Sequence, residues 1–187
     1  MQVLAFAASN SKQSINKALV SHALEVLTDE VAPDAHSQIL DLNDLEMPIY
    51  SIDRQHESGI PEPAHVFFDE IGAADALVIS YAEHNGSYTA AFKNLFDWAS
   101  RIDSRVFQSK PTLAMSASAG GRGGASVLSM ARTSAKFFGA EICASFSVGP
   151  FAACFQNGAL IDQELALRLR DGLAALATRV AQGAPDQ

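Results

Sequence analysis

Ala76-Leu77-Val78-Ile79-Ser80-Tyr81 is a short apolar run, rich in the residues that favour a buried β-strand. Asn85-Gly86 follows it as a turn sequence, and Ser87 is placed to cap a helix. From Ser87 to Ile102, apolar side chains recur on one helical face. This stretch therefore predicts a strand, a loop and a helix, in that order.

The same alternation of apolar run and helical period occurs five times along the chain. The other predicted strands span 3–7, 39–42, 111–116 and 141–148, and the other predicted helices span 14–27, 62–73, 122–138 and 165–180. Only residues 43–63 read as a long loop. The pattern predicts an α/β fold: a flavodoxin-like three-layer sandwich with a five-stranded parallel sheet of order 2-1-3-4-5 and helices on both faces. We expect one domain over residues 1–187.

Composition narrows the function classes. The chain has 187 residues, of which 48% are hydrophobic, enough for a substantial core. Its net charge of −8 excludes the usual nucleic-acid partners, because a polyanion would be repelled. Two cysteines far apart and five scattered histidines fit no metal-ligand spacing. No apolar run approaches the roughly 20 residues of a membrane span, and the N-terminus lacks a signal-peptide pattern. We expect a cytoplasmic protein that binds no metal, nucleic acid or membrane.

In this fold class, ligands bind at the carboxyl ends of the strands, beside the point where strand order reverses. That point lies between the first and third strands. The loops after Ala7, Tyr81 and Ser116 are therefore expected to form one site.

The first loop, Ala8 to Asn16, contains three serines and two asparagines just before a helix. Hydroxyls, amides and free backbone N–H groups at a helix N-terminus form a phosphate cradle. An ordinary strand-to-helix turn uses the same residues. The loop lacks the Gly-Lys-Ser/Thr of a nucleotide triphosphatase.

The second loop, Ala82 to Ser87, is able to present backbone donors and acceptors to the polar edge of a flat heterocycle. The third, Ser116 to Gly124, has four glycines that allow the backbone to approach a flat ring closely. Its spacing does not satisfy G-x-G-x-x-G, because residue 126 is serine, so a Rossmann-type NAD site is not predicted. Solvated loops without a ligand remain the alternative for both.

Together the three loops resemble those of the NADPH-dependent FMN reductase family, flavodoxin-like enzymes that include quinone, azo-dye and chromate reductases. The resemblance covers nearly the whole chain. It lies in Ala8-Ser9-Asn10-Ser11-Lys12-Gln13-Ser14-Ile15-Asn16, in Ala82-Glu83-His84-Asn85-Gly86-Ser87, and in a Ser-x-x-x-Gly-Gly loop from Ser116 to Gly121. Its most specific part is Lys93-Asn94-Leu95-Phe96-Asp97-Trp98.

The resemblance implies a role for each loop. The FMN phosphate would be held by the first loop, through Ser9, Ser11, Ser14, Ile15 and Asn16. The isoalloxazine would be contacted by Ala82, Glu83, His84 and Asn85 on one side and by Ser116, Gly120 and Gly121 on the other. The Lys-Asn-x-x-Asp-Trp residues are expected to be structural or to lie at a subunit contact.

Two departures from the family pattern concern FMN affinity. Ser11 stands where the family has an arginine, so a bidentate phosphate partner is missing. Lys12, its neighbour, is a possible replacement as a point charge. Ala82 and His84 stand where the family has proline and tyrosine. These changes predict weaker or altered FMN binding.

The function implied is an FMN-dependent NAD(P)H oxidoreductase with a ping-pong mechanism. Hydride would pass from NADPH or NADH through bound FMN to a small acceptor: a quinone, free flavin, azo compound or metal oxyanion. No catalytic side chain is required, since the flavin supplies the chemistry. Related proteins are commonly dimers or tetramers, so a homodimer or homotetramer is expected. The alternatives are a flavodoxin-type electron carrier and a scaffold that has lost FMN.

Overall fold

A five-stranded parallel sheet forms the centre of the molecule. The computed structural model describes residues 1–183, and its parallel strands lie in the order β2-β1-β3-β5-β6. Counted among themselves, these strands have the predicted order 2-1-3-4-5. They are β1 (Gln2–Ala8), β2 (His36–Leu40), β3 (Ala76–His84), β5 (Lys110–Ala117) and β6 (Ala140–Val148).

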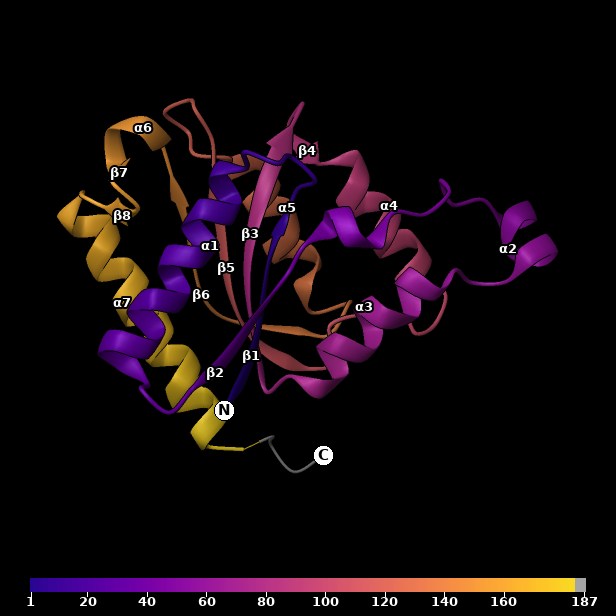
Figure 1. The fold of residues 1–187 in the computed structure, drawn as a ribbon, viewed down its shortest axis with the longest axis horizontal. Coiled ribbons are helices and arrows are strands. Elements are labelled where there is room, and N and C mark those ends of the chain that lie inside the picture. The colour runs from indigo at the N-terminus through magenta and orange to yellow at the C-terminus, as the bar shows by residue number, and fades with distance from the viewer. Residues whose placement is uncertain (184–187) are drawn as a thin grey trace.

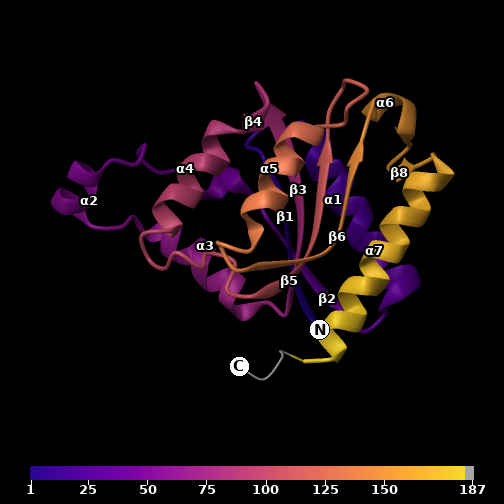
Figure 2. The same ribbon diagram turned by 180° about the vertical axis from the view of Figure 1, so that it is seen from behind.

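Helices cover both faces of the sheet, as predicted (Figures 1 and 2). α1 (Ile15–Val26), continued by the π-helical turn η1 (Leu27–Val31), packs with α7 (Gln163–Ala181) on one face. The other face is covered by α3 (Glu62–Ala73), α4 (Ala90–Ala99) and α5 (Ala125–Ala135). The result is the three-layer sandwich expected from the alternation of strands and helices.

The central position of β3 in the sheet explains why its sequence is apolar on both faces. Leu77, Ile79 and Tyr81 point toward α3, α4 and α5, whereas Val78 points toward α1 and α7. Every residue from Ala76 to Ala82 is buried. A central strand covered on both sides loses the alternation of polar and apolar residues that marks a half-exposed strand.

Residues 43–63 are not the structureless loop that was predicted. They contain part of the 3₁₀ turn η2 (Leu42–Leu45) and the helix α2 (Ile52–Ser58). Ser51 caps α2, but none of the helix residues is buried. Figure 1 shows α2 projecting away from the sheet at the end of an extended segment. Sequence patterns missed it because an unburied helix has no apolar stripe.

The prediction that the third helix of the sequence pattern begins at Ser87 was wrong. Ser87–Tyr88 form a short strand, β4, that pairs antiparallel with the end of β3, so the sheet has six strands and not the five predicted. Asn85 and Gly86 both have positive φ, 53° and 77°, which is the two-residue turn that matches the twist of a hairpin. Helix α4 starts at Ala90, and Thr89 caps it instead of Ser87. The Asn-Gly pair was the available signal for this hairpin.

Smaller differences lie at element ends and near the C-terminus. The second strand begins earlier than predicted, and α5 begins at Ala125 after a four-residue turn rather than at Arg122. A short helix and a two-stranded hairpin precede α7 and were not predicted: α6 (Phe151–Cys154), β7 (Phe155–Gln156) and β8 (Ala159–Leu160). Within residues 1–183, no helix combines the length and the apolar character needed to cross a lipid bilayer.

Candidate functional site

The carboxyl ends of β1, β3 and β5 meet at one edge of the sheet. Ala8 is opposite Tyr81, and Ala82 is opposite Ala117, so the three strands end at the same level. The three loops that follow them emerge together, at the top of Figure 1. This is the arrangement expected beside the reversal of strand order.

The first loop leaves several hydrogen-bond donors free. Ser9 Oγ accepts a hydrogen bond from the Ser11 N–H (3.2 Å), and Ser14 Oγ accepts one from the Lys17 N–H (3.3 Å), so Ser14 is the N-cap of α1. Neither hydroxyl donates to another described residue, and the same is true of Ser11. The backbone N–H groups of Ile15 and Asn16, in the first turn of α1, also lack an acceptor among residues 1–183.

The side chain of Asn16 faces the protein interior. It is 2% exposed, and its carboxamide binds the end of β5 and the middle of β3. Oδ1 accepts hydrogen bonds from the Ala117 N–H (2.9 Å) and the Ser80 hydroxyl (2.8 Å), while Nδ2 donates to the Ala117 carbonyl (3.1 Å). The structure therefore places this side chain between the loops, with only its backbone N–H directed to the helix terminus.

The second loop is the tip of the β3–β4 hairpin. His84 and Asn85 are exposed there, whereas Ala82 is buried beside Ala117 in the sheet. Glu83 reaches the start of α5, where its Oε2 accepts a hydrogen bond from the Val127 N–H (2.9 Å). Gly124, the N-cap of α5, has no side chain, so Glu83 supplies the missing cap and a charge that suits the positive end of the helix.

The third loop combines a fixed base with an open tip. The Ser116 hydroxyl is fully buried, donates to the Gly123 carbonyl (2.8 Å) and lies 2.9 Å from the Ser147 hydroxyl. Gly123 packs so closely on β6 that an added Cβ would lie 2.7 Å from the backbone of Val148. At Gly120 and Gly121, by contrast, an added Cβ would meet no atom nearer than 4.0 Å. Packing within the chain does not require glycine at the tip.

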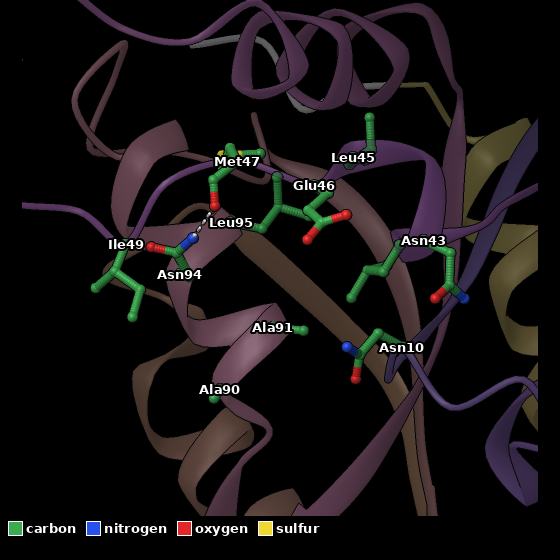
Figure 3. Close-up of a pocket in the computed structure, with 11 residues that line it drawn as sticks. Asn10, Asn43, Leu45, Glu46, Met47, Ile49, Ala90, Ala91, Asn94 and Leu95 are labelled. Atoms are coloured by element: carbon green, nitrogen blue, oxygen red, sulfur yellow. Dashed lines mark hydrogen bonds between the residues drawn. The ribbon is translucent and has the colours of Figure 1, made fainter.

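A cavity of about 290 Å³ adjoins the first loop (Figure 3). Asn10 of that loop lines it, together with residues of η2, the segment after it and the start of α4. Figure 3 shows Asn10 and Asn43 near one another, with Ala90 and Ala91 of α4 beside the open space. Of the three predicted loops, only the first contributes to this cavity.

Two of the Lys-Asn-x-x-Asp-Trp residues, Asn94 and Trp98, hold the segment that precedes α2. Asn94 accepts a hydrogen bond from the Tyr50 N–H (2.8 Å) and donates to the carbonyls of Met47 and Pro48. The Trp98 indole also donates to the Pro48 carbonyl (2.7 Å). These contacts attach the segment that leads to α2 onto α4.

Of the two lysines near the first loop, Lys17 is paired with a carboxylate and Lys12 is exposed. The Lys17 ammonium lies 2.5 Å from the Asp41 carboxylate and lowers the pKa of that carboxyl to about 2. Lys12 is exposed within the loop itself.

Within the described part of the chain, no three His, Cys, Asp or Glu side chains are grouped as metal ligands.

Two residues that organise the site were not singled out from the sequence. Thr89 is buried, donates from Oγ1 to the Ala8 carbonyl (3.0 Å) and caps α4, so it ties that helix to the end of β1. Ser80 supports Asn16 from β3. A lone polar residue inside an apolar strand was the signal for Ser80, because a buried hydroxyl needs a partner.

These observations agree with a comparison against protein families. The model of the NADPH-dependent FMN reductase family matches residues 1–151, which include all three loops. The chain belongs to this family. Curated relatives include an NAD(P)H-dependent FMN reductase of Pseudomonas aeruginosa, 32% identical over 64% of this chain and 61% of the relative. A quinone reductase of Escherichia coli is 30% identical over 67% of this chain and 64% of the relative.

Solved structures share the fold of this reductase family. A flavoenzyme NAD(P)H:(acceptor) oxidoreductase of Paracoccus denitrificans superimposes with a TM-score of 0.74, at 23% identity and with 97% of each chain covered. At that identity the likeness establishes the fold alone. The matched region spans about three fifths of the length of the two curated relatives.

Proposed function

We propose that this protein is an FMN-dependent NAD(P)H oxidoreductase that reduces a small acceptor. The observation that supports it most is the set of free donors at the start of α1. Three serine hydroxyls and two backbone N–H groups lie in eight residues at the positive end of a helix. Membership in the reductase family adds to this argument.

The donors suit a phosphate monoester. Ser9 and Ser14 each use a lone pair within the loop, which orients the oxygen and leaves the hydroxyl proton to donate. The N–H groups of Ile15 and Asn16 lie in the first turn of α1, where the helix dipole favours an anion. Ser9, Ser11, Ser14, Ile15 and Asn16 would thus hold the FMN phosphate.

The flavin ring would lie over the exposed tips of the other two loops. His84 and Asn85 on the hairpin, and Gly120 and Gly121 on the glycine-rich loop, are accessible. Ala82, Glu83 and Ser116 were predicted to contact the ring, but their contacts are with the protein itself. Ala82 pairs with Ala117 in the sheet, Glu83 bonds to the start of α5, and Ser116 bonds to Gly123. They would therefore hold the loop tips in place and not touch the ring. The open space at Gly120 and Gly121 admits a flat ring against the backbone.

Bound FMN would supply hydride transfer between NAD(P)H and the acceptor, and the protein would supply binding and orientation. The first loop fixes the phosphate, and the two tips fix the plane of the ring. Suitable acceptors are a quinone, free flavin, azo compound or metal oxyanion. The cavity beside Asn10 lies next to the phosphate loop and would offer apolar groups, amide groups and the Glu46 carboxylate to a reactant that extends beyond the flavin.

Absorbance of the purified protein with FMN tests this proposal. We expect flavin absorbance to stay with the protein through gel filtration, to bleach on addition of NADPH or NADH, and to return with a quinone. Retained flavin without bleaching would instead support an electron carrier. Protein that fails to retain added FMN would support the scaffold alternative.

We also propose that the protein forms a homodimer or homotetramer. The support is the projecting segment around α2, in which Ile49 and Ile52 are 75% and 47% exposed. Apolar side chains on an arm without buried residues are typical of a contact with another subunit. Sedimentation of the wild type and of the double variant Ile49→Ser, Ile52→Ser tests this, because a dissociated variant with unchanged helix content is the expected result.

A further inference from the structure

A second cavity, of about 230 Å³, lies between α4 and α5, on the side of the sheet opposite α1. Its walls are mainly aromatic and aliphatic side chains from β3, β4, α4, α5 and β6. The aromatic members are Tyr81, Tyr88, Phe92, Phe96, Phe107 and Phe138. The cavity shares no lining residue with the one beside the phosphate loop.

Tyr81, Tyr88, Ser100 and Ser134 each bring a hydroxyl group to the lining of this mainly apolar space, and Tyr81 is the most buried of the four. The residue is 3% exposed, and its hydroxyl forms no hydrogen bond with any residue of the described chain. Burial accordingly raises the pKa of Tyr81, so the group is a neutral O–H donor at physiological pH. Every side-chain nitrogen or oxygen that is sealed from water among the described residues has a hydrogen-bond partner. The Tyr81 oxygen has none, so it is accessible to a molecule the size of water, and a ligand acceptor in the cavity is able to receive its hydrogen bond.

The mouth of the cavity is electrically balanced. Lys93 and Asp97, its two charged lining residues, pair with each other at 2.6 and 2.8 Å. Neither charge is left over to attract an ion. The volume lies below the roughly 300–1,000 Å³ of pockets for drug-sized molecules, so one or two fused rings fit but a nucleotide does not.

We propose that this cavity is a second binding site, for a small neutral aromatic molecule of one or two fused rings that carries a carbonyl. Its rings pack among Phe92, Phe96 and Phe138, and its carbonyl oxygen accepts a hydrogen bond from the Tyr81 hydroxyl. These rings already contact one another. The ring centroids of Phe96 and Phe138 lie 4.7 Å apart with an interplanar angle of 87°, an edge-to-face contact, and those of Phe92 and Phe96 lie 5.9 Å apart at 43°. A planar ligand extends that cluster with the same geometry.

Calorimetric titration of the FMN-loaded protein with 1-tetralone tests the proposal. This bicyclic ketone is the right size and is not an electron acceptor for a reduced flavin, so binding is read out separately from turnover. Tetralin, which has the same rings without the carbonyl, is the matched ligand. We expect 1-tetralone to bind about tenfold more tightly than tetralin, the value of one net hydrogen bond.

Three variants locate the site. Tyr81→Phe removes only the hydroxyl, so it is expected to bind the two ligands equally. Ser134→Phe places a ring in the cavity from α5 and is expected to abolish binding of both. Thr133→Phe adds the same ring at an exposed position that does not line the cavity, and is expected to bind like the wild type.

Binding of 1-tetralone that Tyr81→Phe and Ser134→Phe both leave unchanged would overturn the proposal, since the ligand would then lie elsewhere. Absence of binding would overturn it too. In that case, if the wild type is an oligomer and Ser134→Phe is a monomer, the cavity would be assigned to a contact between copies of the chain.

Discussion

The carboxamide of Asn16 forms a pair of hydrogen bonds with the backbone of Ala117, a residue 101 positions away in the chain. It accepts from the Ala117 N–H at 2.9 Å and donates to the Ala117 carbonyl at 3.1 Å, much as a neighbouring strand would. The same oxygen accepts from Ser80. One side chain thereby joins the start of α1 to two strands and sets the spacing of the loops around the site.

Replacement of this side chain is expected to destabilise the fold. In Asn16→Ala, the Ala117 N–H and the Ser80 hydroxyl lose their acceptor in a buried position, at a cost of about 2–4 kcal/mol in the free energy of unfolding. Urea denaturation followed by circular dichroism measures it. Asn10→Ala, in the same loop but exposed, is the control and should remain within about 0.5 kcal/mol of the wild type. Equal stability of the two variants would contradict the role given to Asn16.

The same substitution at two glycines of the third loop is expected to change different properties: folding stability at Gly123 and FMN affinity at Gly121. Gly123 has φ of 60°, and its added Cβ would lie 2.7 Å from Val148, so Gly123→Ala should lower the stability by more than about 2 kcal/mol. Gly121→Ala meets no such contact and should melt like the wild type. It should nevertheless bind FMN more weakly, because the methyl group stands where the ring would approach. Thermal melts and fluorescence titration with FMN separate the two effects.

A charge restored to the phosphate loop is expected to tighten FMN binding. Ser11→Arg introduces the residue that the family has at this position, and a charge-assisted hydrogen bond to phosphate is worth about 1.5–3 kcal/mol, or roughly tenfold or more in affinity. Gln13→Arg adds the same charge to an exposed position of the same loop. We expect the dissociation constant to fall much further in Ser11→Arg. Similar affinities in both variants would indicate a general effect of charge.

Stability is expected to decrease as the pH falls below about 6.5, through His22. Its Nε2 accepts a hydrogen bond from the Leu160 N–H (3.3 Å), which only the neutral ring can do. Burial lowers the pKa of His22 below its ordinary 6.5, although Glu25 and Glu30 oppose the shift. The unfolded chain therefore takes up this proton first, and the stabilisation present above pH 6.5 is lost on acidification. Melting temperatures of wild type and His22→Gln between pH 5 and 8 should converge at the acid end.

The main strands and helices were predictable from the sequence because each buries apolar side chains, which recur with the period of a strand or a helix. Strand β3 and helix α3 were located from their apolar pattern, and helix Glu62–Ala73 has the predicted ends. The order of the parallel strands followed from the number of β-α repeats and the handedness of crossovers. Helix α2 escaped prediction for the same reason, since none of its residues is buried.

The convergence of the three loops was predicted, but the direction of their side chains was not. The three loops converge as expected, yet Glu83 and Ser116 bond to the protein frame, and Asn16 points inward. Direction depends on partners far away in the chain, such as Ala117 for Asn16, and local sequence contains no information about them. The Asn85-Gly86 hairpin is different, because its turn type is a local property that the sequence did contain.

The projecting segment around α2 has a consequence for how this protein is able to evolve. It joins the body through hydrogen bonds from Asn94 and Trp98 to its backbone atoms, and through two of its side chains: Tyr50 packs against the Trp98 ring, and Gln55 accepts a hydrogen bond from Arg101. No residue of α2 is buried, and Gln55 is the residue of 51–58 whose side chain hydrogen-bonds to the body, so substitutions at the other positions are expected to leave the core and the three loops unchanged. Selection is therefore able to change the exposed side chains of this segment, and any contact that they make with another molecule, with little effect on folding stability.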